Sequence, residues 1–334
     1  MGSVGNWVGR HCLVTGGMGF IGSNLALTLE QAGAEVVVVD ALIPEHGGDR
    51  RNLLNAHDIR IVDSLISNES VVGPLIKKSD WIFNVAGQVS HHESMTDPLR
   101  DLELNAREHL AFLEMVRREN ADAVIVQTST RQVYGRPLQT PVAEDHPTTP
   151  RDINGVSKLA GEFFHRIYGS VHGLRTASLR LTNVYGPRQC LNKTTLGFLP
   201  VFISRALRGE TIRVFGDGNQ RRDCLHVDDV TAVLMESAEA VATDRIEKGS
   251  FFNVGTSESI TVGNIAEVIV RTTGGSSRVA YEPWPKELEM IDIGDFATDF
   301  SRLSEALGWF PRVAFSDGIA ATIEFYREHP WYLS

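Results

Sequence analysis

The chain has 334 residues, of which 42% are hydrophobic and 22% are charged, as is ordinary for a folded globular protein. Its net charge of −10 excludes a general nucleic-acid-binding surface, because such a surface needs a basic field to displace counterions from phosphates. The total is still compatible with a local basic pocket for one small anion. The three cysteines lie far apart, without histidines at metal-ligand spacing, so we expect neither a disulfide framework nor a metal site.

No apolar run approaches the ~18 residues that a membrane-spanning helix needs, and no signal peptide precedes the first predicted strand. We therefore expect a cytoplasmic protein in a reducing compartment, with no membrane partner. Cys12 falls in an apolar strand and is predicted to be a small buried residue. Met1–Gly5 is predicted to be an unstructured leader.

Short β-branched runs alternate with amphipathic segments through the first half of the chain. The run Val36–Val39 is apolar on both faces, as expected of a parallel strand with helices above and below it. Strand–helix–strand units with right-handed crossovers predict an open, doubly wound α/β sheet, with ligands at the carboxyl ends of the strands. The predicted elements are strands His11–Thr15, Glu35–Asp40, Ile59–Val62, Trp81–Val85, Ala123–Thr128 and Arg175–Leu181, and helices Ile21–Ala32, Leu102–Asn120 and Val156–Val171.

The texture of the chain changes after about Gly186, where proline, glycine and arginine become frequent. Phe251–Val254 predicts a late strand that returns to the main sheet. We expect residues 1–186 plus about 225–256 to form the larger α/β domain, and residues 187–224 plus 257–334 to form a smaller, discontinuous lobe. The helices predicted in that lobe lie near Val262–Thr273, Arg302–Leu307 and Phe315–His329.

A glycine-rich turn follows the first predicted strand and opens the first predicted helix. Its three spaced glycines allow a tight turn, a close approach of backbone to pyrophosphate, and close helix–strand packing. The helix N-terminus then presents free N–H groups and a positive dipole end to the phosphates. The residues expected to contact a dinucleotide here are Gly16, Gly19, Phe20, Ile21 and Gly22.

Two carboxylates and one small residue extend this site. Asp40 ends the second strand, where a carboxylate accepts hydrogen bonds from the adenosine ribose and repels a 2′-phosphate, which favours NAD over NADP. Asp63 closes the third strand and either meets the adenine amino group or serves as a turn or cap residue. Ala86, after the fourth strand, is small enough for backbone to pass close to the cofactor. The larger domain is thus predicted to be an NAD-binding Rossmann domain, and the smaller lobe to bind the substrate.

Together with later motifs, these residues resemble the extended short-chain dehydrogenase/reductase family, the NAD-dependent epimerase/dehydratase group. The resemblance covers nearly the full chain and is specific for the family, though not for one reaction. It implies transient hydride transfer between a sugar carbon and bound NAD, with the sugar held by its nucleotide diphosphate. The motifs that carry it are Thr15–Gly22, Asp40, Asn84–Gln88, Ser129–Gly135, Ser157–Lys158, Arg180–Arg188, Arg222–Asp223 and Asp228–Asp229.

The resemblance also implies roles for single residues at the reacting end of the site. Thr130 is expected to hydrogen-bond the reacting sugar oxygen. Lys158 is expected to bond the nicotinamide ribose and to supply positive charge. Gln88 is expected to contact the substrate.

For the nucleotide end, the resemblance implies that Asn183 contacts a substrate phosphate and that Arg222 pairs with the diphosphate, with help from Arg188. Bidentate arginine suits that task. The alternative for Arg222 is a surface arginine paired with Asp223. Phe215 is expected to flank the nucleotide base, or else belongs to an ordinary turn. Relatives carry a further arginine that assists the diphosphate, and the corresponding stretch here, residues 289–292, has none.

Asn154 departs from the family pattern, because the family's general base is a tyrosine four residues before the lysine. An amide has no proton to exchange in the range of a phenol, so Asn154 cannot do that work. Arg131 and Gln132 are a second departure. In the 4,6-dehydratases of the family these positions hold an acid and a base, and Arg and Gln cannot move the protons that eliminating water requires.

If the chain is catalytic, another group must move the proton. His91 and His92 follow the fourth strand at the active-site edge of the sheet, and imidazole suits proton exchange at neutral pH. We hypothesise that one of them, or Tyr185, replaces the phenol; the alternative is a pair of solvated loop histidines. Lys158 is a further candidate only if burial lowers its pKa.

Three functions are therefore open. The first is an NAD-dependent epimerase of a nucleotide-diphosphate sugar, acting at C4 through a keto intermediate. The second is another nucleotide-sugar oxidoreductase or a decarboxylase, and the third is a non-catalytic binding protein. Helices Leu102–Asn120 and Val156–Val171 carry apolar stripes that relatives pair in a dimer as a four-helix bundle, although such stripes also fit packing on the protein's own sheet.

Overall fold

The computed structural model describes residues 7–44, 46–193 and 196–334, so the leader predicted over Met1–Gly5 lies outside the described residues. Its main element is a seven-stranded sheet in the order β10-β6-β5-β4-β1-β2-β3, in which every pairing is parallel. This confirms the doubly wound fold. The strands are β1 (His11–Thr15), β2 (Glu35–Asp40), β3 (Arg60–Asp63), β4 (Trp81–Asn84), β5 (Val124–Thr130), β6 (Arg175–Leu181) and β10 (Ser250–Val254).

The strand order reverses between β1 and β4, so the connections that leave their carboxyl ends run to opposite faces of the sheet and leave a crevice there. In the middle of the sheet Val14 of β1 pairs with Val38 of β2 on one side and Phe83 of β4 on the other. All three side chains are fully buried, as the β-branched and aromatic composition of the strands predicts. The crevice therefore has a rigid floor.

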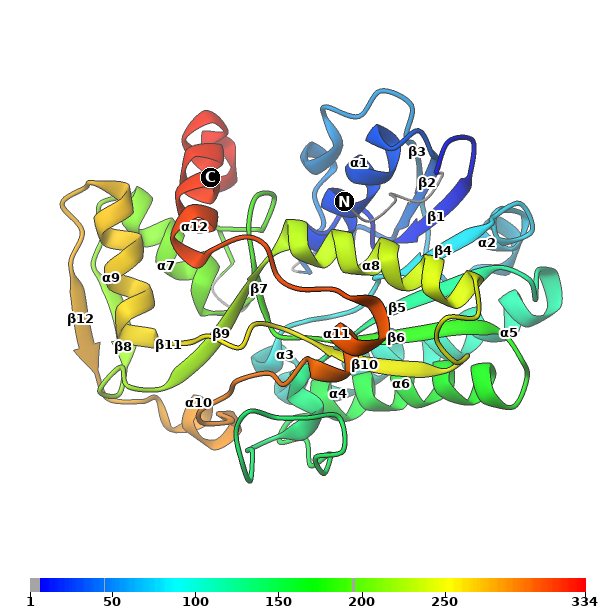
Figure 1. Ribbon diagram of the computed structural model, residues 1–334. Helices are drawn as coiled ribbons and strands as arrows, with labels where there is room; N and C mark the ends of the chain where they lie inside the picture. The colour runs from blue at the N-terminus through cyan, green and yellow to red at the C-terminus, as the bar shows by residue number, and fades with distance from the viewer. Residues whose placement is uncertain (1–6, 45, 194–195) are drawn as a thin grey trace.

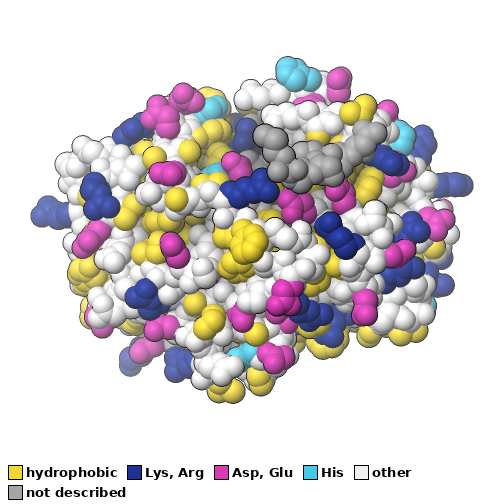
Figure 2. Space-filling view, viewed as in Figure 1, with side chains coloured by type: hydrophobic (Ala, Val, Ile, Leu, Met, Phe, Trp, Pro, Cys, Tyr) yellow, Lys and Arg dark blue, Asp and Glu magenta, His cyan; other side chains and the backbone are white. Residues whose placement is uncertain are grey.

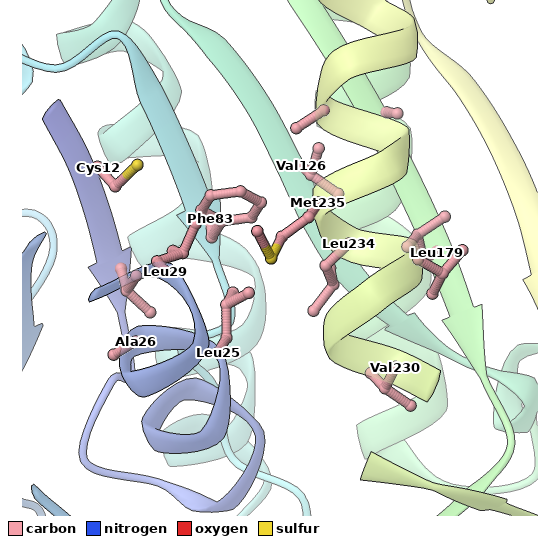
Figure 3. Packing of buried hydrophobic residues seen from close by; sticks show 14 of the residues in the cluster. Cys12, Leu25, Ala26, Leu29, Phe83, Val126, Leu179, Val230, Leu234 and Met235 are labelled. Carbon is pink, nitrogen blue, oxygen red and sulfur yellow. The ribbon is translucent and has the colours of Figure 1, made fainter. Parts of the chain in front are cut away.

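Helices cover both faces of the sheet (Figure 1). On one face α1 (Phe20–Gln31) packs against α8 (Val227–Ala242), and Leu25 of α1 points toward Met235 of α8 above Phe83 (Figure 3). On the other face lie α2, α5 and α6. The other helices and short helical segments before β6 are η1 (Arg50–Leu53), α2 (Glu69–Ile76), α3 (His91–Thr96), α4 (Pro98–Leu102), η2 (Glu103–Arg107), α5 (Glu108–Glu119), η3 (Arg131–Tyr134) and α6 (Ile153–Ser170).

The region after β4 differs from the prediction. The helix predicted over Leu102–Asn120 is three segments, because the π-helical turn η2 separates α4 from α5. Such turns occur often at functional sites. This turn aims buried Asn105 at the β4 loop, where its Oδ1 accepts a hydrogen bond from Gln88 N (3.0 Å). His91 and His92 begin the short helix α3 rather than lying in a loop.

A smaller lobe stands beside the main sheet, at the left in Figure 1. It has its own apolar core, which includes Ile203, Ile265 and Ile319. One segment predicted for this lobe, α11 (Ser301–Leu307), instead packs on α8 and β10, with Leu303 in the main core. The remaining elements of the chain are β7 (Asn183–Tyr185), α7 (Phe198–Leu207), β8 (Ile212–Phe215), β9 (Arg221–His226), β11 (Ser259–Thr261), α9 (Val262–Thr273), β12 (Val279–Glu282), α10 (Lys286–Ile291), α12 (Phe315–Glu328) and η4 (Pro330–Leu333).

Two compositional predictions bear on the surface and the core. Cys12 is buried in the main core, as predicted, and burial raises the pKa of its thiol to about 12. Acidic, basic and apolar side chains are interspersed on the face shown in Figure 2. Within residues 7–44, 46–193 and 196–334, no helix combines the length and apolar character that crossing a membrane requires. The cytoplasmic location stays a prediction.

Candidate active site

The turn between β1 and α1 leaves no room for side chains at two of its glycines. Gly16 has φ +65°, and a Cβ built on it would lie 2.7 Å from Ala86 Cα. A Cβ on Gly22 would lie 2.3 Å from the carbonyl oxygen of Gly16. Only glycine fits either position. The backbone of β1, of α1 and of the β4 loop can therefore come into direct contact, with no side chain between the segments.

The N-terminus of α1 opens toward a large cavity. Its N-cap residue, Gly19, has no side chain with which to cap the helix. The N–H groups of the first turn can therefore donate to an external acceptor, which the positive end of the helix dipole also attracts. Gly19, Phe20 and Ile21 all line the cavity. This cradle fits the pyrophosphate of a dinucleotide.

Asp40 stands beside this cradle at the end of β2. Its Oδ2 accepts a hydrogen bond from Met18 N (3.0 Å), and its Oδ1 accepts one from Leu42 N (2.8 Å). Each carboxylate oxygen retains a lone pair that can accept a ribose hydroxyl. Burial raises the pKa of Asp40, while the backbone N–H groups act against that rise. The residues of the turn and Asp40 therefore fit NAD.

Asp63 does not share this position. Its side chain is half exposed and forms an ion pair with Arg50. The cavity is lined instead by the residues that follow it, among them Ser64 and Ile66. Asp63 ends β3 as predicted, but its placement does not support a contact with adenine.

The cavity has a volume of about 1040 Å³ and is walled by both lobes. That volume lies at the upper end of the range for small-molecule sites. It reaches from the glycine turn to the ends of β4, β5 and β6 and on to the smaller lobe. Of the residues predicted for the site, it is lined by Gly16, Gly19, Phe20, Ile21, Gly22, Asp40, Ala86, His91, His92, Thr130, Asn154, Lys158, Asn183, Phe215 and Arg222.

Thr130 and Lys158 both line the cavity. Thr130 ends β5, and its hydroxyl oxygen accepts a hydrogen bond from Gln132 N (3.2 Å), which leaves the hydroxyl hydrogen free to donate. Lys158 keeps some exposure through the cavity, but its surroundings are dense. This desolvation lowers the pKa of Lys158 to about 8, against an opposing effect of the Asp101 carboxylate.

Asn154 is bound into the wall of the cavity. Its Nδ2 lies within hydrogen-bond distance of Gln88 O (3.0 Å), Gln88 Oε1 (2.8 Å) and Asp101 Oδ2 (3.0 Å). Asn105 Nδ2 also donates to Asp101 Oδ2, at 3.0 Å. Asn154 thereby joins α6, the β4 loop and α4. Its amide acts as a structural donor at the position where the resemblance implies a phenol.

His91 belongs to a polar cluster on the cavity wall. Its Nε2 lies 3.0 Å from Gln132 Nε2. Its Nδ1 lies 2.9 Å from Asp152 Oδ2, at ion-pair distance but without hydrogen-bond alignment. Asp152 is buried and also caps α6 by accepting from Gly155 N (2.6 Å). His92 is exposed at the cavity rim.

Comparison with known proteins agrees with this site. Residues 12–255 match the model of the NAD dependent epimerase/dehydratase family. The chain belongs to that family. It is 32% identical over 316 residues to the UDP-glucose 4-epimerase of Mycolicibacterium smegmatis, covering 94% of this chain and 98% of that one.

Two further relatives show the range of the family. The chain is 30% identical over 326 residues to a dTDP-glucose 4,6-dehydratase of an Actinoplanes species, covering 94% of this chain and 97% of the relative. The UDP-glucose 4-epimerase of Thermotoga maritima, solved with UDP-glucose, superimposes with a TM-score of 0.86 at 30% identity, covering 96% of this chain and 99% of that one. The protein is thus an enzyme of a nucleotide-sugar-modifying family whose cofactor is NAD.

At the nucleotide end, this member of the epimerase/dehydratase family has an altered charge pattern. Arg222 is buried and pairs with Asp292 (2.8 Å), not with Asp223. Asp292 lies in the stretch where relatives carry the assisting arginine. Asn183 Oδ1 accepts a hydrogen bond from Arg131 Nη2 (2.8 Å). A carboxylate therefore offsets the cation expected to hold the diphosphate.

Besides Asp63, three predicted residues lie away from the cavity lining. Gln88 is turned into the wall, where its Nε2 donates to Ser90 O (2.9 Å) and its Oε1 accepts from Asn154. Arg188 donates to Asn24 Oδ1 of α1 (2.9 Å) and lies over the ring of Phe325. These two placements do not support direct contact with the substrate.

Tyr185 is the third. It is fully buried in the smaller lobe against Phe315 and His226. Burial raises the pKa of its phenol well above the ordinary value. It is therefore not a substitute for the missing base.

An aromatic pair closes the far end of the cavity. Phe215 and Trp284 both line it, with their ring centroids 5.6 Å apart. Phe215 was predicted by the resemblance to flank the nucleotide base, with an ordinary turn as the alternative. Trp284 was missed, because its only signal is a tryptophan between two prolines, at residues 283 and 285. Asp101 and Asp152 were missed as well, although Asp152 stands at a predictable N-cap position.

Asp40→Asn is predicted to weaken NAD binding by about 10- to 100-fold, because a neutral amide replaces a charged acceptor of ribose hydroxyls. The ratio of NADP to NAD affinity should rise in the same variant, since the repulsion of a 2′-phosphate is removed. Titration calorimetry with both cofactors measures these effects. Asp63→Asn is the matched control and should bind NAD like the wild type; a large loss there would place Asp63 in the site.

Lys158 is predicted to make the stability depend on pH. Its pKa of about 8 is below the ordinary value near 10.4, so between these pH values the unfolded chain holds a proton that the folded chain has lost. Stability from this group therefore rises with pH across that window. Lys158→Met should be more stable than wild type near pH 7, and the difference should shrink toward pH 10. Urea unfolding at several pH values measures it, and a constant difference would contradict the lowered pKa.

Proposed function

We propose that this protein is an NAD-dependent epimerase of a nucleotide-diphosphate sugar, which inverts one sugar carbon, first of all C4, through a keto intermediate. One observation carries the proposal. A single cavity joins the glycine turn and Asp40 to Thr130 and Lys158, and continues to Arg222 and the Phe215–Trp284 pair. A cofactor and a nucleotide sugar can therefore lie end to end, with the sugar group next to the cofactor and the nucleotide at the far end of the cavity.

Bound NAD would supply reversible hydride acceptance at the sugar carbon. The protein has to hold the sugar oxygen and move its proton. Thr130 has a free hydroxyl hydrogen for that oxygen. Lys158 adds positive charge nearby, and its lowered pKa leaves part of the population neutral at pH 7 to 8. Arg131 and Gln132 cannot supply the acid and base of a dehydratase, which favours chemistry at one carbon.

We assign the proton exchange to His91. The Asp152 carboxylate beside Nδ1 favours the imidazole form with its proton on Nδ1, which leaves the Nε2 lone pair on the cavity side. Gln132 Nε2 lies 3.0 Å from His91 Nε2 on that side, and a sugar hydroxyl can displace it. Because Asp152 is fixed by capping α6, the ring is held in position from behind.

A panel of UDP-, GDP-, CDP- and dTDP-sugars, with products identified by mass and NMR, tests the proposal. An epimerase yields a product of unchanged mass with one inverted carbon and no net NADH. Loss of carbon dioxide, or net NADH formation, would instead identify a decarboxylase or a dehydrogenase on the same scaffold.

His91→Ala is predicted to lower kcat on the substrate so identified by about 10²- to 10⁴-fold, the usual contribution of a general base. His92→Ala is the matched control, because His92 is exposed, and it should retain most of the activity. Steady-state rates of both variants decide the point. Unchanged rates in both would remove the histidines from the mechanism and leave Lys158.

The second candidate is a binding protein that keeps the pocket without turnover. Its support is Asn154, which stands where the resemblance implies a phenol and whose Nδ2 contacts Gln88 and Asp101 in the cavity wall. If the site has instead been rebuilt around His91, Asn154→Tyr should gain no activity. The variant should also be less stable by about 1–3 kcal/mol, because a larger ring is forced into a filled wall. A large gain in turnover, measured beside a thermal melt, would instead indicate a degraded active site.

We further propose a homodimer formed through α5 and α6. Leu110 of α5 and Phe163 and Ile167 of α6 are apolar yet 37% to 45% exposed, on helices whose other faces are buried. Phe163→Glu combined with Ile167→Glu should convert a dimer into a monomer in light scattering. Leu138→Glu, at an exposed apolar residue elsewhere, is the control. A wild-type monomer at micromolar concentration would contradict the proposal.

A further inference from the structure

Arg131 holds a fixed guanidinium group in the wall of the cavity. It directly follows Thr130 and begins η3, so its backbone lies within one residue of the proposed reacting centre. Its side chain is 91% buried, since only 9% is exposed, and it lines the cavity. Asn183 Oδ1 accepts from Nη2, and the guanidinium carbon lies 5.2 Å from the centroid of the Phe296 ring.

The other terminal nitrogen of Arg131 has no protein acceptor. Nη1 is buried and without a hydrogen-bond partner. Within residues 7–44, 46–193 and 196–334, no carboxylate forms an ion pair with Arg131. Burial and the neighbouring Arg222 lower the pKa of Arg131 to about 10, so the group is still a cation at neutral pH. A buried cation with an unused donor is costly unless an anion arrives.

The acidic residues nearby are committed elsewhere. Asp292 pairs with Arg222. The two oxygens of Asp223 accept hydrogen bonds from Thr182 and Thr298. Both carboxylates attract Arg131 only from beyond ion-pair distance.

We propose that Arg131 binds an anionic group on the sugar itself, a carboxylate, so that the substrate is a nucleotide-linked acidic sugar. The inference rests on the proposed function and names its substrate class. The planar guanidinium matches a carboxylate in shape and hydrogen bonding. Thr130 and Arg131 line the same cavity, so a sugar whose reacting oxygen meets Thr130 can present a charged substituent to Arg131. The diphosphate stays assigned by the resemblance to the Arg222 and Asn183 end of the cavity.

Calorimetric titration of the NAD-loaded protein with matched glucose and glucuronate conjugates, linked to UDP and in parallel to dTDP, tests the inference. Wild type should bind the glucuronate conjugate at least 10-fold more tightly than the glucose conjugate. Arg131→Gln should lose that preference, with affinity for the glucose conjugate and the free nucleotide almost unchanged. Arg131→Lys, which keeps the charge but not the planar group, should retain part of the preference.

Arg213→Gln is the matched control, because Arg213 also lines the cavity but is half exposed and lies 3.5 Å from Glu282; it should leave the preference intact. Equal binding of the two conjugates by wild type would overturn the inference. So would an equal loss of all ligands in Arg131→Gln, which would assign Arg131 to the diphosphate. If wild type binds the glucuronate conjugate preferentially but does not convert it, only the proposed epimerisation is contradicted. If wild type binds neither conjugate, both proposals are contradicted.

Discussion

The site depends on a contact between bare backbone, where the turn at Gly16 meets the start of the loop after β4 at Ala86. A single Cβ on Gly16 would lie 2.7 Å from the Cα of Ala86, so the two strand ends meet only because one carries no side chain. That approach brings the N-terminus of α1, the Asp40 carboxylate and the β4 loop to one edge of the crevice. In the same loop, Gln88 is hydrogen-bonded to Asn105 of η2 and to Asn154 of α6. These bonds hold the reacting end of the cavity in place.

The cavity combines residues that fit NAD with a wall that departs from the pattern implied by the family resemblance. The glycine turn, Asp40, Thr130 and Lys158 all line the cavity. Asn154, at the position where the resemblance implies a phenol, ties the wall together. The wall beside it carries a His91–Asp152 pair. Arg131 places a buried cation where, by the resemblance, the 4,6-dehydratases of the family have an acid. Under our proposals, both the proton-transfer group and the charge of the sugar pocket therefore differ from those of a dehydratase.

Local patterns predicted the fold, and the glycine turn and Asp40 that they indicated both line the cavity. The bounds of β1, β2 and β6 follow directly from apolar runs, and Asp40 follows from its place at a strand end. Interactions between distant segments were beyond such patterns. Arg222 pairs with Asp292 across 70 residues, and the π-helical turn at Asn105 has no signal in hydrophobic periodicity. Gln88 and Arg188 were predicted by resemblance, yet hydrogen bonds with Asn154 and Asn24 turn their side chains away from the cavity. Strand position predicts where a backbone ends, but neighbouring side chains decide where a residue such as Asp63 points.

The central claim is that a dinucleotide lies across the glycine turn with its adenosine ribose at Asp40. Denaturing the purified protein and quantifying the released cofactor by absorbance and mass tests this claim most directly. The account predicts NAD or NADH, approaching one molecule per chain after incubation with NAD, and no displacement by equimolar NADP. Absence of any dinucleotide after that incubation, or preferential retention of NADP, would contradict it.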